Sequence, residues 1–193
     1  QVGGVIGSIG IETDFDRDED LNRVGSYSLE YDYLARALAV SCVNRGEVTA
    51  QRDYAGGVVG RAFLGQVYGC ESYGPVVSTD GSYVGGIAGS SWGSIRESWS
   101  KCGLSGTDYI GGTAGYGDTL ENCHTLVSVL SGEAYVGAIA GDVDEDGTVK
   151  GNTFTHETLG ALDGISYAGK AEPVSFADLC AAPGVPETFA QME

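Results

Sequence analysis

The sequence predicts an all-β protein: a parallel β-helix, or β-solenoid, of about five coils, with an insertion in the first coil and a short C-terminal helical cap. Three observations support this prediction. A motif of the form Tyr-x-Gly-Gly-x-x-Gly recurs along the chain, a second apolar segment follows each copy, and small residues recur at one step of every unit. Repeats with a period of roughly 20 to 50 residues are typical of architectures in which each unit packs only on its neighbours.

The motif copies set the period of the repeat. They begin at tyrosines that are 29, 26, 26 and 32 residues apart, namely Tyr54, Tyr83, Tyr109, Tyr135 and the degenerate Tyr167, and a truncated copy starts at Val2. Glycine disfavours helix by about 1 kcal/mol relative to alanine, so a glycine pair in most units indicates strands and turns. We expect these glycines where backbones approach closely or bend, apolar residues between them in the core, and the tyrosines in a ladder.

The second half of each unit predicts a turn, a strand and an interior position. Glycine-bearing turns are expected at Leu64-Gly65, Trp92-Gly93, Gly117-Asp118 and Asp146-Gly147. The second apolar segments begin at Val67, Ile95, Leu120 and Val149. Three residues further on lie Cys70, Ser98, Cys123 and Asn152, and Cys42 occupies the same step of the first unit. We interpret these residues as an interior stack with one layer per coil.

Two segments break the period and divide the chain into a solenoid, residues 1–171 with an insertion at 11–39, and a cap, residues 172–193. The insertion carries the acidic run ETDFDRDED, and the spacing of Tyr31, Leu34 and Leu38 predicts a short helix near 29–39. Ser175 through Asp178 has the form of a capping box with Asp in place of Glu, and Pro183-Gly184 ends the helix. We expect this atypical terminal unit to cover an exposed end of the core.

The repeated motif resembles a known bacterial repeat. GVIG at Gly4, GVVG at Gly57, GIAG at Gly86 and GTAG at Gly112 resemble the GLUG motif, although GTAG has Thr113 at the apolar position, and AIAG at Ala138 departs from it by having alanine first. The CVNRGEV stretch from Cys42 is similar to the continuation of that motif. The resemblance implies a secreted or surface protein of bacteria, as in adhesins and the non-catalytic regions of immunoglobulin A-specific metallopeptidases. It implies no catalytic residues.

Charge and the length of the apolar runs each exclude one class of interaction. The net charge of -17 and only ten Lys and Arg would repel phosphates, so we expect no nucleic-acid partner. No apolar run is long enough to cross a bilayer, so we expect no membrane insertion by this segment. The chain begins within a repeat, and we expect it to be an extracellular or cell-surface piece of a larger bacterial protein.

Acidic residues at alternate positions form a candidate calcium site. Asp142, Asp144 and Asp146 precede Gly147 in the pattern that opens a calcium-binding loop. Thr153 stands where such a loop needs a bidentate Glu, and the segment coincides with an ordinary turn of the repeat, so a plain acidic turn is the competing interpretation. A similar alternation, at Asp14, Asp16, Asp18 and Asp20, lacks the glycine and is interpreted as a solvated acidic loop. Calcium is the only cofactor that the sequence suggests.

The cysteines predict free thiols. An odd number of them cannot form a complete set of intramolecular disulfides, and three share the interior step. A buried free thiol behaves as a small hydrophobic group. We therefore expect reduced and mostly buried thiols at Cys42, Cys70, Cys102, Cys123 and Cys180.

These features favour a non-catalytic module, either an adhesin-like binding element or a structural spacer. The expected partner is a host or cell-surface protein or glycan, and Trp92 and Trp99 are the first candidate contacts. Trp99 follows the interior step directly, so simple packing is its competing interpretation. The alternative function is a carbohydrate-active β-helix enzyme, a polysaccharide hydrolase or lyase, because a solenoid can bring distant carboxylates together.

Overall fold

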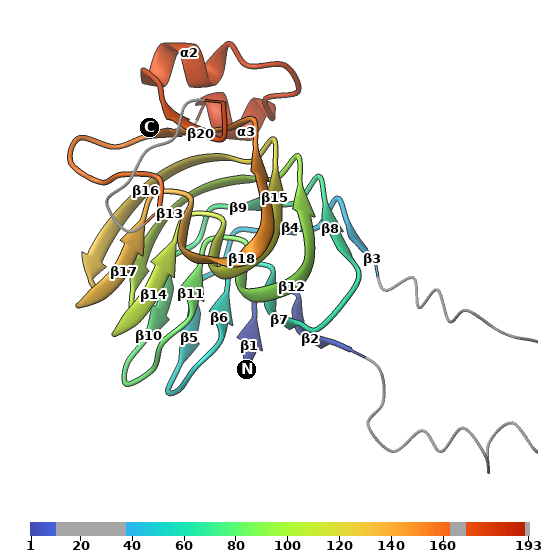
Figure 1. Cartoon of the computed structure of the whole chain (residues 1–193), viewed down its shortest axis with the longest axis vertical. Helices are drawn as coiled ribbons and strands as arrows, with labels where there is room; N and C mark the ends of the chain where they lie inside the picture. Colours follow the sequence, from blue (N-terminus) through green and yellow to red (C-terminus); the bar gives the residue numbers. More distant parts are fainter. Residues whose placement is uncertain (11–37, 163–168, 192–193) are drawn as a thin grey trace, which may run out of the picture.

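The solenoid prediction is confirmed. The computed structural model describes residues 1–10, 38–162 and 169–191, of which 56% lie in strands and 6% in helices. The strands pair in parallel and stack coil upon coil over about four complete turns (Figure 1). The sheet with the fewest strands has five, because the incomplete coils at the two ends of the solenoid also contribute strands to it.

Three parallel sheets form the walls of the solenoid. Sheet A contains, in spatial order, β1 (Val2–Gly3), β6 (Ala55–Gly56), β11 (Val84–Gly85), β14 (Asp108–Gly111) and β17 (Ala134–Gly137). Sheet B contains β2 (Ile6–Ile9), β3 (Leu38–Val40), β7 (Val59–Ala62), β8 (Gln66–Tyr68), β12 (Ala88–Arg96), β15 (Ala114–Glu121) and β18 (Ala140–Lys150). Sheet C contains β4 (Val43–Asn44), β5 (Val48–Ala50), β9 (Glu71–Ser72), β10 (Val76–Ser78), β13 (Trp99–Ser105), β16 (His124–Ser131), β19 (Asn152–Thr155) and β20 (Ala171–Pro173).

The coils stack in the register that the repeat predicts. Equivalent residues pair from coil to coil in sheet A, in the column Val2, Ala55, Val84, Ile110 and Val136. The second apolar segments form a column of sheet B in the same way, through Ala39, Val67, Ile95, Leu120 and Val149. Val67, Ile95 and Leu120 are at most 1% exposed, so this column lies in the core. Burial of each such side chain contributes about 1.5–3 kcal/mol.

Close approach of backbones explains the first glycine of each pair. A Cβ on Gly85 would lie well inside van der Waals distance of the carbonyl oxygen of Ala88, three residues ahead, and close to Ala114 in the next coil. Gly3, Gly56, Gly111 and Gly137 are crowded by the carbonyl at the same offset. The motif therefore folds the chain tightly against itself at one corner of every coil.

The tyrosines, rather than the motif glycines, hold the left-handed backbone conformation. Tyr54, Tyr83, Tyr109 and Tyr135 have φ of 68°, 64°, 56° and 55°. Such values are outliers for a bulky residue and cost on the order of 1–3 kcal/mol each. The rings stack in the predicted ladder, with centroids 4.9, 4.7 and 4.5 Å apart. Each stacked pair offsets part of that cost, by about 0.5–1.5 kcal/mol beyond burial.

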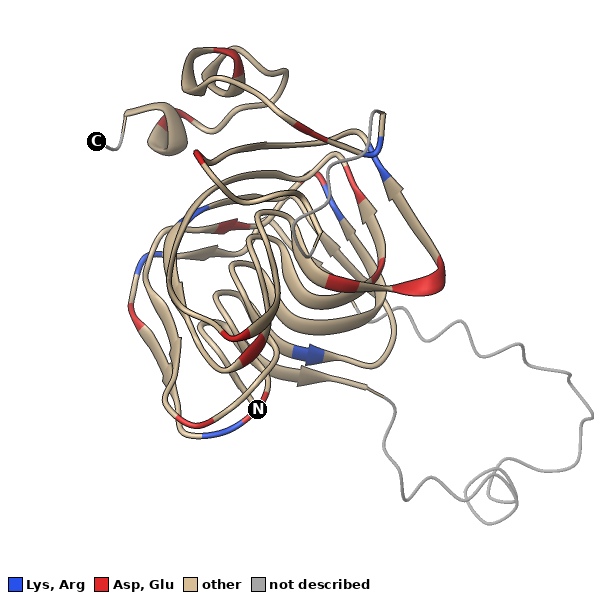
Figure 2. Cartoon of the chain, turned by 60° about the vertical axis from the view of Figure 1, so that its left-hand side comes forward, with Lys and Arg blue, Asp and Glu red and all other residues tan. Residues whose placement is uncertain are grey.

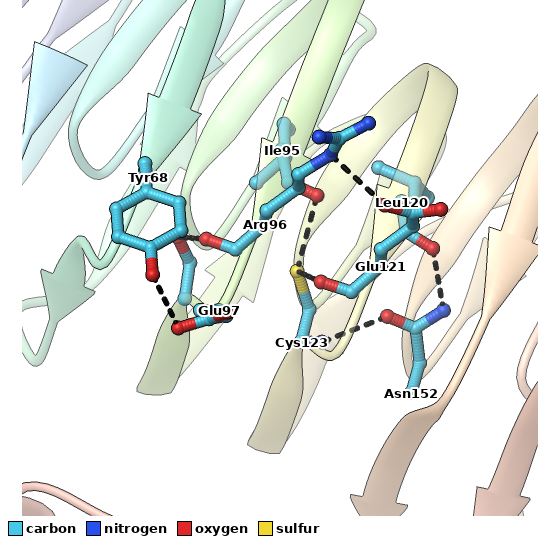
Figure 3. A network of polar contacts seen from close by, with 9 residues as sticks. Tyr68, Ile95, Arg96, Glu97, Leu120, Glu121, Cys123 and Asn152 are labelled. Carbon is cyan, nitrogen blue, oxygen red and sulfur yellow. Dashed lines mark hydrogen bonds and ion pairs between the residues drawn. The ribbon is translucent and has the colours of Figure 1, made fainter. Parts of the chain in front are cut away.

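The predicted interior stack exists and forms a polar ladder, which we define as Cys42, Cys70, Ser98, Cys123 and Asn152. Four of its five members are buried, and Cys42 is half-buried. Backbone N–H groups donate to the next member: that of Cys70 to Ser98 Oγ at 3.2 Å, and that of Cys123 to Asn152 Oδ1 at 2.9 Å. Side chains donate backwards, Cys123 Sγ to the carbonyl of Ile95 and Asn152 Nδ2 to that of Leu120 (Figure 3).

Two expectations about local structure were wrong. Trp92-Gly93, Gly117-Asp118 and Asp146-Gly147 are not turns but lie inside the continuous strands β12, β15 and β18, where the pairing register shifts instead. A helix was also expected near 29–39, but Leu38 and Ala39 belong to the strand Leu38–Val40, which pairs with β8. The rest of the expected helix, residues 29–37, lies outside the described ranges. Alternating burial and parallel pairing therefore outweigh helical spacing at this point.

The C-terminal cap contains α2 (Phe176–Cys180) and α3 (Glu187–Gln191). Ser175 caps α2 as predicted, since its Oγ accepts from the Asp178 N–H at 3.1 Å. The cap does not simply cover the end of the core but packs on the outer face of sheet C (Figure 1). Its buried Phe189 contacts Trp99 of β13, and Thr188 accepts a hydrogen bond from Arg45 of the first coil at 3.2 Å. The cap thus contacts both the first coil, at Arg45, and a later coil, at Trp99.

Candidate binding surfaces and the buried thiols

Trp92 lies on an exposed aromatic and acidic surface of sheet B. Its side chain is 47% exposed, and its ring packs against that of Tyr116 in the next coil with centroids 5.3 Å apart. Tyr116 donates a hydrogen bond to Asp144 Oδ2 at 3.1 Å, in the coil after that. We define the Trp92 surface as Trp92, Tyr116, Asp118, Asp142 and Asp144, which come from β12, β15 and β18. Sequence reasoning identified Trp92 but missed Tyr116, because the pairing of the two rings depends on register.

Negative charge is concentrated on the Trp92 surface. Partial burial, the hydrogen bond to Asp144 and the neighbouring carboxylates raise the pKa of Tyr116 to about 12. Burial and the charge of Asp144 raise the pKa of Asp118 above its ordinary value. Both shifts have the sign that a surplus of negative charge produces. Acidic residues also outnumber basic ones over the rest of the molecule (Figure 2).

The candidate calcium residues lie in a strand rather than in a calcium-binding loop. Asp142, Asp144 and Asp146 all belong to β18, and the Asp146 N–H donates to Asp144 Oδ1 at 3.1 Å. Within the described residues, no group of three or more His, Cys, Asp or Glu side chains is arranged to hold a metal ion. Calcium binding at these aspartates stays a prediction. The run from Asp14 to Asp20 lies outside the described ranges.

Trp99 is buried beneath the cap, at 4% exposure. Its ring packs on His124 of the next coil with centroids 4.1 Å apart and meets the edge of Phe189. This arrangement matches the packing interpretation of Trp99. A pocket of about 490 Å³ lies beside the pair, between sheet C and the loop that joins the two cap helices.

The five cysteines are free thiols. Cys70, Cys102 and Cys123 are buried, whereas Cys42 and Cys180 are half-buried. Burial raises the pKa of the Cys70 thiol to about 11 and those of Cys102 and Cys123 to about 12. Since the thiolate is the reactive form, the three buried thiols are protected twice: reagents cannot reach them, and their raised pKa keeps them protonated.

We expect two kinetic classes of thiol. At pH 8, a disulfide reagent such as 5,5′-dithiobis(2-nitrobenzoate) should modify Cys42 and Cys180 first. Cys70, Cys102 and Cys123 should react only as the chain unfolds. Denaturation without a reductant should release a total of five thiols, as the sequence also predicts. Three thiols or fewer under denaturing conditions would contradict the free state of the ladder cysteines.

Comparison with protein-family models, with curated proteins and with solved structures found no match. In the part of the chain that the structure describes, no helix is long and apolar enough to cross a membrane. Inferences about function therefore depend on the geometry of the exposed surfaces and the pocket.

Proposed function

We propose that this chain is a non-catalytic binding module, an adhesin-like GLUG-type repeat element of a bacterial cell-surface or secreted protein, and that the Trp92 surface contacts its partner. The observation that carries the proposal is the half-exposed Trp92 ring packed on Tyr116 and bordered by Asp118, Asp142 and Asp144. An aromatic residue that stands in solvent on a rigid sheet is a common anchor of binding sites.

Charge complementarity favours a basic protein segment as the partner. Aromatic faces attract guanidinium and ammonium groups, and carboxylates accept charge-assisted hydrogen bonds from the same groups. An arginine side chain stacked on Trp92 can therefore reach an aspartate of the same surface. The net charge of -17 also accelerates encounter with a cationic partner. A rigid solenoid presents these groups without an ordering cost at each binding event.

Binding of an arginine-containing peptide tests the proposal. We expect a peptide of alternating arginine and serine residues to bind the intact chain in a salt-dependent manner, as measured by calorimetry at low ionic strength. Trp92→Ala and Asp144→Asn should each weaken binding about tenfold. Trp92→Ala removes the ring on which the guanidinium stacks, and Asp144→Asn removes the carboxylate with which it pairs. A tenfold loss corresponds to about 1.4 kcal/mol.

Two control variants separate this contact from general charge attraction. Glu157→Gln removes one exposed carboxylate outside the Trp92 surface, and Leu130→Ala removes a side chain that is 72% exposed. Both should change the peptide affinity less than twofold. Equal losses in Asp144→Asn and Glu157→Gln would reduce the effect to net charge and overturn the proposed site.

Trp92-dependent binding of a neutral oligosaccharide, without peptide binding, would replace the protein partner with a glycan. Cleavage of that oligosaccharide would instead support the carbohydrate-active enzyme.

A further inference from the structure

The pocket beside Trp99 is built from the repeat and the cap together. Glu97, Asn122 and Gly151 are the left-handed corner residues of three successive coils, with φ of 49°, 52° and 65°. Trp99 follows Glu97 by two residues, and His124 follows Asn122 by two residues. Trp99 and His124 therefore pair in the register of β13 and β16. Pro183 and Gly184, from the loop between α2 and α3, complete the lining.

The repeat stacks the polar and aromatic groups of the pocket in two columns. The corner column presents the carboxylate of Glu97 and the amide of Asn122, one coil apart. The second column presents the paired rings of Trp99 and His124, whose centroids are 4.1 Å apart. The volume of about 490 Å³ falls in the range of small-molecule sites, roughly 300–1,000 Å³. One wall is therefore apolar and the other hydrogen-bonding.

Two of the three polar groups are fixed by hydrogen bonds, and all three keep capacity for a ligand. Tyr68 donates to Glu97 Oε2 at 2.6 Å, which fixes the carboxylate and leaves its second oxygen as an acceptor (Figure 3). His124 Nδ1 is paired with Thr153 Oγ1 at 2.7 Å, so Nε2 is the remaining hydrogen-bonding atom of the ring. Among the described residues, the Asn122 side-chain amide makes no hydrogen bond, and it offers both a donor and an acceptor. Burial lowers the pKa of His124 to about 4, so its ring is neutral at pH 7.

We propose that this pocket binds a neutral polyhydroxylated ligand, one or two sugar rings in size. Sugar hydroxyls both donate and accept, which matches the carboxylate and the amide of the corner column and the imidazole nitrogen of the second column. The apolar face of a sugar ring packs against the half-buried His124 ring and the exposed edge of Trp99. Among the described residues that line the pocket, Glu97 alone is charged, so acidic sugars and phosphates are repelled. This site is distinct from the Trp92 surface and does not depend on it.

A variant with a single tryptophan tests the pocket in the intact chain. Trp92→Phe leaves Trp99 as the only tryptophan of the protein, so its emission reports on the pocket. Titration with glucose, galactose, mannose, N-acetylglucosamine and maltose should give a saturable change with at least one of them, at millimolar dissociation constants. In the same background, Glu97→Gln and Asn122→Gly should each weaken that sugar about tenfold. Glycine is chosen at position 122 because it tolerates the left-handed backbone.

Matched variants outside the pocket provide the controls. Glu71 accepts a hydrogen bond from Tyr73, as Glu97 does from Tyr68, and Ser41 holds the same left-handed corner in the first coil. Glu71→Gln and Ser41→Gly should change the sugar affinity less than twofold. No saturable response to any sugar would overturn the proposal, as would a response that Glu97→Gln and Asn122→Gly leave unchanged. A response to ethanolamine but to no sugar would show a cation site instead and would also overturn it.

Discussion

Gly85→Ala should destabilise the protein by more than about 4 kcal/mol or prevent folding altogether. The added Cβ would collide with the carbonyl of Ala88 and with the Cα of Ala114 in the next coil. Both obstacles are backbone atoms, so no rotation of a side chain can relieve the overlap. The two strands must separate, and the column of sheet A that runs through Val84 and Ile110 must shift with them. Effects of this size are exceptional for single substitutions and point to a backbone clash.

Urea unfolding monitored by circular dichroism measures this effect. Gly103→Ala is the matched control within the solenoid, because its Cβ would lie 3.7 Å from the side chains of Leu130 and Ser128, at ordinary contact distance. Gly7→Ala is a second control, since nothing lies within 4 Å of the added atom. Both should leave stability nearly unchanged or raise it by up to about 1 kcal/mol, by restricting the unfolded chain. Equal stability of Gly85→Ala and Gly103→Ala would contradict the coil geometry.

The sequence predicted the repeated parts of the fold well because the same constraint acts in every coil. The period, the parallel stacking, the apolar column through Val67 and Ile95, and the interior step of Cys70 and Cys123 all follow from side chains that recur at fixed spacing. Ala138 in place of the usual glycine also fits this picture. It belongs to the last full copy of the motif. The segment that follows it in the stack, around Gly160, does not repeat the motif, so the constraint that requires glycine in the earlier coils is absent there.

The parts that the sequence did not predict depend on packing between coils. Glycine-bearing pairs such as Trp92-Gly93 resemble turns, yet pairing with the neighbouring coils keeps them extended and shifts the register instead. The left-handed tyrosines contradict local preference, and the stack of rings that offsets part of their cost forms only between coils. The cap also required tertiary information, because nothing in its own residues shows that Phe189 packs on the flank at Trp99.

The two candidate sites illustrate the same division. Trp92 is conspicuous as a large aromatic residue beside a glycine, and its side chain is exposed, while its role in binding stays a prediction. Its neighbours Tyr116 and Asp144 lie 24 and 52 residues away in sequence and could be assigned only through the register of β12, β15 and β18. For the pocket, Glu97 and Asn122 carry no motif at all. Their common place at the left-handed corner of successive coils is visible only in backbone angles.

Asn152→Ala should cost roughly 3–5 kcal/mol, because it leaves the buried Cys123 N–H without an acceptor, removes the amide donor to two backbone carbonyls and opens a cavity. Asn152 is 1% exposed and closes the polar ladder at the last coil. Its Oδ1 accepts from the Cys123 N–H at 2.9 Å, and its Nδ2 donates to the carbonyls of Leu120 at 2.8 Å and Lys170 at 3.1 Å (Figure 3). Alanine supplies none of these bonds and opens a cavity where the amide was.

Asn152→Ser distinguishes hydrogen bonding from volume, because the protein itself places a serine at this step of another coil. Ser98 accepts from the Cys70 N–H and donates to the carbonyl of Arg96, two residues before it. A serine at 152 can accept from the Cys123 N–H in the same way but lacks the amide donor that reaches the Leu120 and Lys170 carbonyls. We therefore expect Asn152→Ser to lose about half as much stability as Asn152→Ala in urea unfolding. Equal losses would assign the role of Asn152 to packing, whereas a graded loss would show that hydrogen bonds between coils stabilise the end of the solenoid.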